Sequence, residues 1–225
     1  MLAKLRCLPR LFLCLLVAAR FCAAEPAQSN PVVNIYILRT GEQLQSPHVV
    51  TYHMFEWAQM RGRWILPDVG YYDAGYGQDQ IWFAGGGGDI VRRKRFTWEQ
   101  EIYFTQEAGP DAHNQRSIWI WPVLDFSPGR RFFGEVVAYP TLPLNREQGW
   151  GFDVDRAKIE RATGSHWLTG VGYSASTGSG EHWQSKPFAT VTRKTRAGNF
   201  EFWLERIRGG GQVQFRYLLV KSNND

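Results

Sequence analysis

The chain has 225 residues, with 26 basic and 21 acidic side chains and a formal charge of +5. Hydrophobic residues make up 44% of it and aromatic residues 15%, including ten Trp. This apolar content excludes a disordered chain, and the length fits a single domain.

The first 24 residues have the pattern of a secretory signal peptide. Three basic residues precede an apolar run of nine, LFLCLLVAA, and two alanines precede Glu25. Segments of this kind are removed on export, and nine apolar residues are too few for a spanning helix, which needs about 20. We therefore predict cleavage after Ala24, so that residues 1–24 are a signal peptide.

Removal of this segment changes both the charge and the cysteine content. The segment carries four basic residues, no acidic residue and all three cysteines, so the mature chain has 22 basic and 21 acidic residues and a formal charge of +1. A near-neutral charge argues against nucleic acid as a partner. Without Cys the mature chain forms no disulfide, and export without disulfides favours a protein of the bacterial envelope or the extracellular space.

From Phe96 onward the sequence alternates polar and apolar residues in segments separated by short Gly-, Pro- or Asn-containing breaks. A period of two predicts half-buried strands, and short breaks predict that neighbouring strands pair antiparallel. The expected strands are Phe96–Thr105, Ser117–Phe126, Arg131–Tyr139, Gly151–Ala162, Trp167–Ser176, Pro187–Thr195, Asn199–Ile207 and Gln212–Lys221. Residues 96–225 are thus predicted to form an antiparallel β-meander.

Residues 25–95 are expected to add N-terminal strands and loops to the same domain. Val32–Leu38 and Gln80–Ala84 have strand patterns, whereas His48–Met60 is ambiguous: Pro47 and a following Gly fit helix ends, but its β-branched and aromatic residues favour a strand. The run Gly85–Gly88 predicts a flexible loop or hairpin. The expected fold is all-β, an antiparallel meander of about 8–12 strands closed as a barrel, with a β-sandwich or jelly roll as the alternative.

The alternation fits two environments. In the last expected strand, Phe215 and Tyr217 lie on one face and Gln214 and Arg216 on the other. A soluble β-protein would bury the apolar face, whereas an outer-membrane barrel turns it toward lipid and lines its interior with polar residues. The expected strands have 9–12 residues, closer to the roughly 9–11 of membrane strands than to the 5–6 or so of ordinary ones.

Charged and aromatic residues occupy definite places in this pattern. We expect a charge network on the polar faces, lining a narrow lumen, from Glu99, Glu101, Glu135, Arg156, Lys158, Glu160, Glu201, Glu205 and Arg216. Trp and Tyr near strand ends suit the aromatic girdles of membrane barrels, and the expected aromatic interface consists of Trp98, Trp119, Trp121, Trp167, Tyr173 and Tyr217.

The one dense basic patch contains Arg92, Arg93, Lys94 and Arg95. Basic clusters beside a membrane contact anionic headgroups or, in the outer membrane, the phosphates of lipopolysaccharide. A solvated strand edge is the other interpretation, because charge there discourages aggregation of sheets.

These patterns resemble those of bacterial outer-membrane β-barrels over Phe96–Lys221, most clearly in FEFWLERIRGGGQVQFRYLLVK, where a Gly-rich turn joins two amphipathic strands. The resemblance implies an outer-membrane location, contact with membrane lipid or lipopolysaccharide, and a structural or passive binding or pore role. The chain departs from the class after Tyr217, because LLVKSNND follows where such chains close on a terminal aromatic residue. The alternative is a soluble periplasmic or secreted β-protein that binds or cleaves carbohydrate.

Catalytic chemistry is weakly indicated. Three carboxylate pairs share a strand face, as a glycosidase requires, but an ion-paired lumen or an exposed face explains them equally; they are Glu99 with Glu101, Asp153 with Asp155, and Glu201 with Glu205. A lyase-type site could be assembled from Tyr173, His166, His182, Arg193 and Gln184, although no spacing demands it. No His pair has metal-ligand spacing. We assign no catalytic residue, metal ligand or cofactor, and carbohydrate stays open as a ligand.

Overall fold

The computed structural model describes residues 32–45, 48–73, 80–109, 115–145, 150–177, 183–207 and 210–222. These residues belong to one unit, Pro31–Asp225. The predicted signal peptide lies outside the described residues, as do His113 and His182. No helix within the described ranges is long and apolar enough to cross a membrane.

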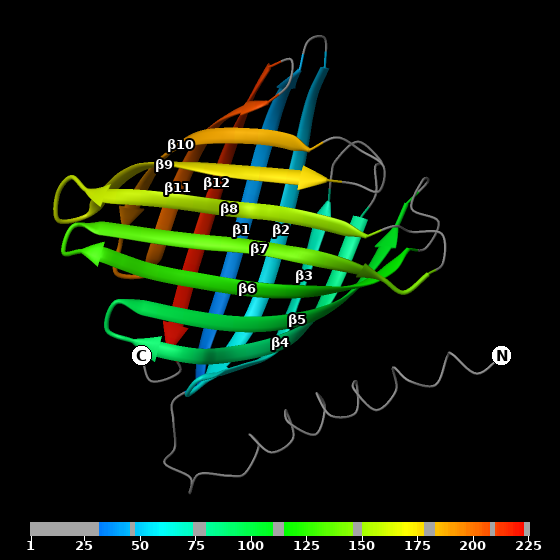
Figure 1. Ribbon diagram of the computed structural model, residues 1–225, viewed down its shortest axis with the longest axis horizontal. Coiled ribbons are helices and arrows are strands. Elements are labelled where there is room, and N and C mark those ends of the chain that lie inside the picture. Colours follow the sequence, from blue (N-terminus) through cyan, green and yellow to red (C-terminus); the bar gives the residue numbers. More distant parts are fainter. Residues whose placement is uncertain are drawn as a thin grey trace, which may run out of the picture. The chain divides into compact units, whose positions relative to one another are not determined.

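Twelve strands make up the described residues: β1 (Val32–Gln45), β2 (His48–Arg61), β3 (Trp64–Asp73), β4 (Gln80–Arg93), β5 (Phe96–Ala108), β6 (Arg116–Gly129), β7 (Phe132–Pro143), β8 (Gly151–Ala162), β9 (Trp167–Thr177), β10 (Gln184–Lys194), β11 (Gly198–Ile207) and β12 (Gly210–Ser222). Each strand pairs antiparallel with its neighbours in sequence, and β1 pairs with β12 (Figure 1). The predicted all-β meander closed as a barrel is confirmed, and the sandwich alternative is wrong.

The glycine run Gly85–Gly88 lies within β4 and is not the predicted loop or hairpin. A Cβ atom on Gly85 would overlap the main chain of β5 at Ile102, and one on Gly87 would overlap it at Gln100. Glycine is therefore needed here because β4 and β5 approach closely, and no turn is involved.

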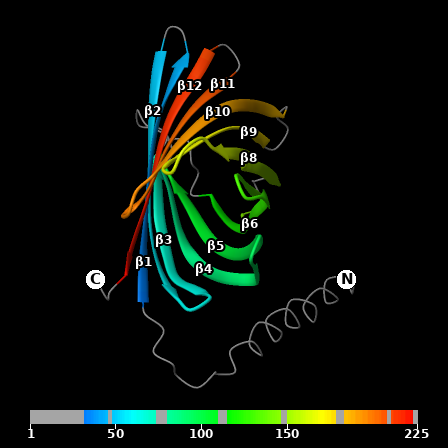
Figure 2. The same cartoon turned by 90° about the vertical axis from the view of Figure 1, so that its left-hand side faces the viewer.

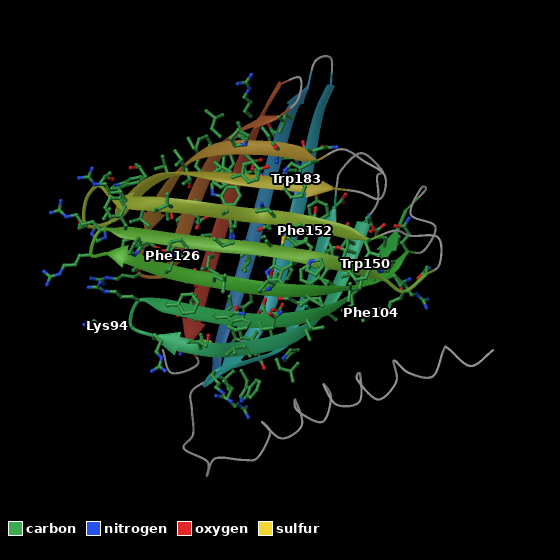
Figure 3. All side chains as sticks on the ribbon, in the orientation of Figure 1. Lys94, Phe104, Phe126, Trp150, Phe152 and Trp183 are labelled. Carbon is green, nitrogen blue, oxygen red and sulfur yellow. The ribbon has the colours of Figure 1, made fainter. Side chains whose placement is uncertain are left out.

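The two ends of the barrel differ in their connections. At one end, which we call the turn end, residues 62–63, 94–95, 130–131, 163–166 and 195–197 join the strands. At the other, the loop end, the connections are 46–47, 74–79, 109–115, 144–150, 178–183 and 208–209. Figure 3 shows Lys94 at the turn end, on the opposite side of the molecule from Trp150 near the loop end. The connections at the turn end have two to four residues, whereas four of the six at the loop end have six or seven. Short turns at one end and longer loops at the other are typical of outer-membrane barrels.

The direction of the side chains distinguishes the two environments that the alternation allows. On the final hairpin, Phe200 is 48% exposed and Phe215 is 53% exposed, whereas Trp203 and Glu205 are 1% and 2% exposed. The apolar face of the sheet thus forms the outer surface of the barrel, and the polar face lines its interior. This arrangement is the inverse of a soluble barrel and the one expected in lipid.

Candidate functional site: the barrel interior

A cavity of about 830 Å³ occupies part of the interior. Its lining includes Ile35 and Ile65, near the turn end, as well as Gly151 and Gln212, near the loop end. The cavity therefore extends along most of the height of the barrel.

The interior beside β9, β10 and β11 is filled by side chains. The rings of Phe188 and Trp203 stack with centroids 4.4 Å apart, and Thr192 donates a hydrogen bond of 2.6 Å to Glu160. No residue of β11 within the described ranges lines the cavity. The barrel thus has a packed side and an open side, and the open side lies along β2 to β6.

An ion-pair network, which we call the bridge, crosses the interior between the β7–β8 side and the β11–β12–β1 side. Arg39 Nη1 on β1 lies 2.7 Å from Asp155 Oδ1 on β8, and Lys158 Nζ on β8 lies 2.7 Å from Glu201 Oε1 on β11. Figure 2 shows that β1 and β8 lie on opposite sides of the barrel. The bridge consists of Arg39, Glu135, Asp155, Arg156, Lys158, Glu160, Glu201 and Arg216. Its four cationic and four carboxylate side chains give a formal net charge of zero.

Trp203 supports the bridge from the packed side. The Arg39 guanidinium carbon lies 5.1 Å from the centroid of the indole ring, and Lys158 Nζ lies 5.9 Å from it. The indole N–H donates a hydrogen bond of 3.2 Å to Glu201. These cation–π contacts and the hydrogen bond fix the orientation of the charged groups.

A second group of charges, which we call the acidic wall, lines the open side of the cavity. It consists of Glu56 on β2, Asp68 on β3, and Glu99 and Glu101 on β5. The Tyr103 hydroxyl lies 2.8 Å from Asp68 Oδ2 and 2.7 Å from Glu101 Oε2. The phenol links two carboxyl groups from strands that are not adjacent.

Gly85 on β4 makes this link feasible. It pairs with Asp68 of β3 on one side and with Tyr103 of β5 on the other. Because Gly85 has no side chain, the Tyr103 hydroxyl reaches across β4 to Asp68. The glycine run thus brings the acidic groups of β3 and β5 together.

Basic residues are absent from this side of the cavity. Among the described residues that line it, every Arg and Lys comes from β1, β8, β10 or β12, and none from β2 to β6. The interior is therefore electrostatically asymmetric, with a self-neutral bridge facing a wall of carboxyl groups.

Aromatic rings lie between these two charged regions. Trp121 stacks on Tyr139 with centroids 4.2 Å apart, and Trp119 lies 5.4 Å from the same tyrosine. Trp119 and Trp121, which are predicted for the aromatic interface, thus line the cavity instead. The reason is the alternation of β6, which gives the outward positions to Ile118 and Ile120.

The other residues predicted for the aromatic interface lie on the outer face. Trp98 is 37% exposed and Trp167 is 46% exposed. Tyr217 stacks on the exposed Phe200 with centroids 4.1 Å apart, and the Tyr173 hydroxyl lies 2.9 Å from the Ser185 hydroxyl.

The nine residues predicted as one charge network fall into three settings. Six belong to the bridge, and Glu99 and Glu101 belong to the acidic wall. Glu205 accepts hydrogen bonds from Ser174 and Gln214 and forms no ion pair with a described residue. Arg39 and Asp155 are not among the residues that the sequence predicts for the network. Arg39 continues the alternation of Ile35 and Ile37, so its inward direction was readable from the sequence.

Asp155 could not be placed by alternation. A register shift between Val154 and Ala157 adds an extra residue to β8, so Asp155 and Arg156 both face the interior although they are consecutive. A bulge of this kind changes the direction of the side chains that follow it, and the polar–apolar alternation of the sequence does not show where it occurs.

Of the candidate catalytic sets, the pairs Glu99 with Glu101 and Asp153 with Asp155 line the cavity, whereas the other carboxylate pair and the lyase-type set are not brought together. Glu201 and Glu205 have separate partners. His166 is exposed at the turn end, Tyr173 lies on the outer face, and Gln184 and Arg193 lie at opposite ends of β10. Within the described ranges, no group of three or more His, Asp or Glu has the arrangement of a metal site.

The basic patch lies at the turn end, with Arg93, Lys94 and Arg95 exposed and Arg92 paired with Asp89. Further basic residues surround the same end of the barrel. Together they form what we call the basic collar: Arg61, Arg63, Arg92, Arg93, Lys94, Arg95, Arg130, Arg131, Arg161, Arg193, Lys194 and Arg196.

No family model matches the chain, and no curated protein matches it. Solved outer-membrane barrels do resemble it. The NanC porin aligns with a TM-score of 0.59 at 8% identity, covering 84% of this chain and 99% of that one. The KdgM porin in complex with disordered oligogalacturonate aligns with a TM-score of 0.57 at 8% identity, covering 83% and 98%. An outer-membrane channel from Pseudomonas putida F1 aligns with a TM-score of 0.56 at 9% identity, covering 89% and 98%. The chain therefore has the fold of outer-membrane porins and channels.

Proposed function

We propose that the mature protein lies in the bacterial outer membrane and provides a passive pathway for small solutes. The observation that carries this proposal is the outward apolar face, on which Phe200 and Phe215 are half exposed while Glu205 is buried inside. In water such a surface would drive aggregation, whereas in a bilayer it is the expected lipid contact. The predicted signal peptide supports export.

The interior supports a narrow pathway. Barrels of about eight strands are filled by side chains, and those of about 16–18 strands leave a wide aqueous channel. This barrel has twelve strands, a cavity of about 830 Å³ and a bridge that fills part of its cross-section. We infer passage of small solutes along the open side, between the bridge and the acidic wall.

The orientation follows from the connections, because short turns face the periplasm in outer-membrane barrels. The basic collar then lies at the inner leaflet, which is made of phospholipid. Trp64, Phe96 and Trp167, all exposed at the turn end, would lie in the interfacial zone beside it. We infer that the collar contacts anionic phospholipid headgroups, each basic residue contributing about 1 kcal/mol, and lipopolysaccharide would contact the opposite end.

Neutral sugars are a second candidate class of permeant. Trp119, Trp121 and Tyr139 line the cavity, and flat amphipathic rings suit sugar contacts. One structurally similar porin holds oligogalacturonate; in this chain the acidic wall would repel such a polyanion. Liposomes containing the protein should therefore swell faster in glucose than in glucuronate.

Location and orientation are tested together by cysteine labelling. The mature chain has no Cys, so Leu144→Cys at the loop end and Lys94→Cys at the turn end each provide a single thiol. A membrane-impermeant maleimide should label the first variant in intact cells and the second only after lysis. Recovery of the protein in the soluble periplasmic fraction without detergent would overturn the proposal.

A further inference from the structure

We propose that the acidic wall binds small organic cations that carry an ammonium or guanidinium group, and that it makes the pore cation-selective. This inference rests on the proposed pore function and specifies the class of solute that the pore favours.

The first support is the charge balance of the interior. The arginines that line the cavity, Arg39, Arg156 and Arg216, are held by carboxylates of the bridge. Neither Glu56 nor Glu99 forms an ion pair with a described residue, although both line the cavity. The carboxyl groups of the wall are thus left without cationic partners from the described chain, and a bound cation would offset their mutual repulsion.

The second support is a buried acceptor atom of the wall that lacks a donor. Asp68 is 1% exposed and lines the cavity. Its Oδ1 atom has no hydrogen-bond partner among the described residues. An unsatisfied buried acceptor costs about 1–3 kcal/mol, and an ammonium group, with several N–H donors on one centre, supplies the missing donor.

The third support distinguishes an organic cation from a bare metal ion. Phe83 and Tyr103 pack at 82° with centroids 5.3 Å apart, and Trp121 meets Tyr103 at 90° with centroids 6.1 Å apart. All three rings line the cavity beside the acidic wall. Aromatic faces attract ammonium and guanidinium groups, whereas metal ions prefer oxygen ligands. The cavity volume also lies in the range of about 300–1,000 Å³ that is usual for small-molecule sites.

The selectivity experiment uses protein purified in detergent after expression of the full chain. Channels in a planar bilayer under a KCl gradient should give a reversal potential that corresponds to a K⁺ permeability about ten times the Cl⁻ permeability, because acidic clefts concentrate cations. The triple variant Glu56→Gln, Glu99→Gln, Glu101→Gln should lose this preference. Glu42→Gln is the matched control, because Glu42 is exposed on β1 and does not line the cavity; it should keep the preference of the native chain.

Blocking experiments identify the class of cation. Putrescine should block the K⁺ current, and the concentration for half block should rise at least tenfold in the triple variant and remain unchanged in Glu42→Gln. Glucose should not block. If Mg²⁺ blocks as strongly as putrescine with the same dependence on the variant, the site is a metal-cation site and the proposal is wrong.

Folding of each variant is checked by its heat-modifiable migration on a gel. If the triple variant does not fold, Glu56→Gln alone replaces it, with a smaller shift in the same direction expected. Channels without cation preference would overturn this inference. The pore function would still stand, because a pore whose carboxyl groups are protonated can conduct ions without selecting cations. Absence of channels from the native chain would instead count against the pore function itself.

Discussion

Arg39 on β1 and Asp155 on β8 form an ion pair inside the barrel, although four strands separate β1 from β8 along the shorter path around the sheet. Their side chains are 14% and 12% exposed. Asp155 also pairs with Arg156. The contact therefore connects opposite walls and limits the cross-section that is open to solutes.

Removing one partner of this pair should destabilise the barrel. We expect Asp155→Ala to lower the free energy of unfolding by about 3 kcal/mol, because a largely buried guanidinium loses its carboxylate. Urea titration of the detergent-folded protein, followed by Trp fluorescence, measures the change. The double variant Arg39→Met, Asp155→Ala should be less destabilised than the sum of the single variants, and strict additivity would show that the two residues do not interact.

The outward face of β11 offers a test of the lipid contact. Phe202 is 37% exposed near the middle of the strand. We expect Phe202→Arg to destabilise the membrane-folded protein by about 2–4 kcal/mol, the cost of a charge near the bilayer midplane. Phe202→Leu is the control and should cost much less. An equal cost for both substitutions would indicate that the position does not face hydrocarbon.

The packed side of the interior depends on a glycine. Gly172 on β9 pairs with Phe188 on β10, and a Cβ atom at residue 172 would overlap the phenyl ring. We expect Gly172→Val to cost about 1–3 kcal/mol, the usual range for overpacking. Adding Phe188→Ala should recover part of this loss in the same urea titration. No recovery would mean that the strain lies in the backbone.

Charge reversal in the basic collar tests the contact with phospholipid. Arg93 and Arg95 are exposed at the turn end. Arg93→Glu with Arg95→Glu should weaken the association of the protein with vesicles that contain phosphatidylglycerol, and added salt should reduce the difference. Vesicles of phosphatidylcholine alone are the control. An equal effect on both kinds of vesicle would rule out recognition of anionic headgroups.

The sequence predicted most of the fold because period-two alternation and turn residues are local signals. The bounds of β8, Gly151–Ala162, agree with the prediction. Gly85–Gly88 was predicted as a loop because a close approach between strands leaves the same glycine-rich signal as a turn. The ambiguous segment His48–Met60 lies within β2, where pairing with β1 and β3 outweighs any local preference for helix.

The candidate site was less predictable, because it depends on which strands meet across the interior. Alternation places Glu101 and Arg156 on polar faces without showing that they occupy different sides of one cavity. The link from Tyr103 to Asp68 crosses β4, and no local pattern shows a contact across an intervening strand. The sequence likewise contains no local pattern that predicts the bulge that turns Asp155 inward.

Single-channel recording tests the central claim most directly. Protein purified from membranes and shown to be folded by heat-modifiable migration is added to a planar lipid bilayer at constant voltage. A passive pore predicts discrete, long-lived current steps whose size is proportional to voltage. Folded, inserted protein that produces no current steps would contradict a pore and leave the barrel a structural role.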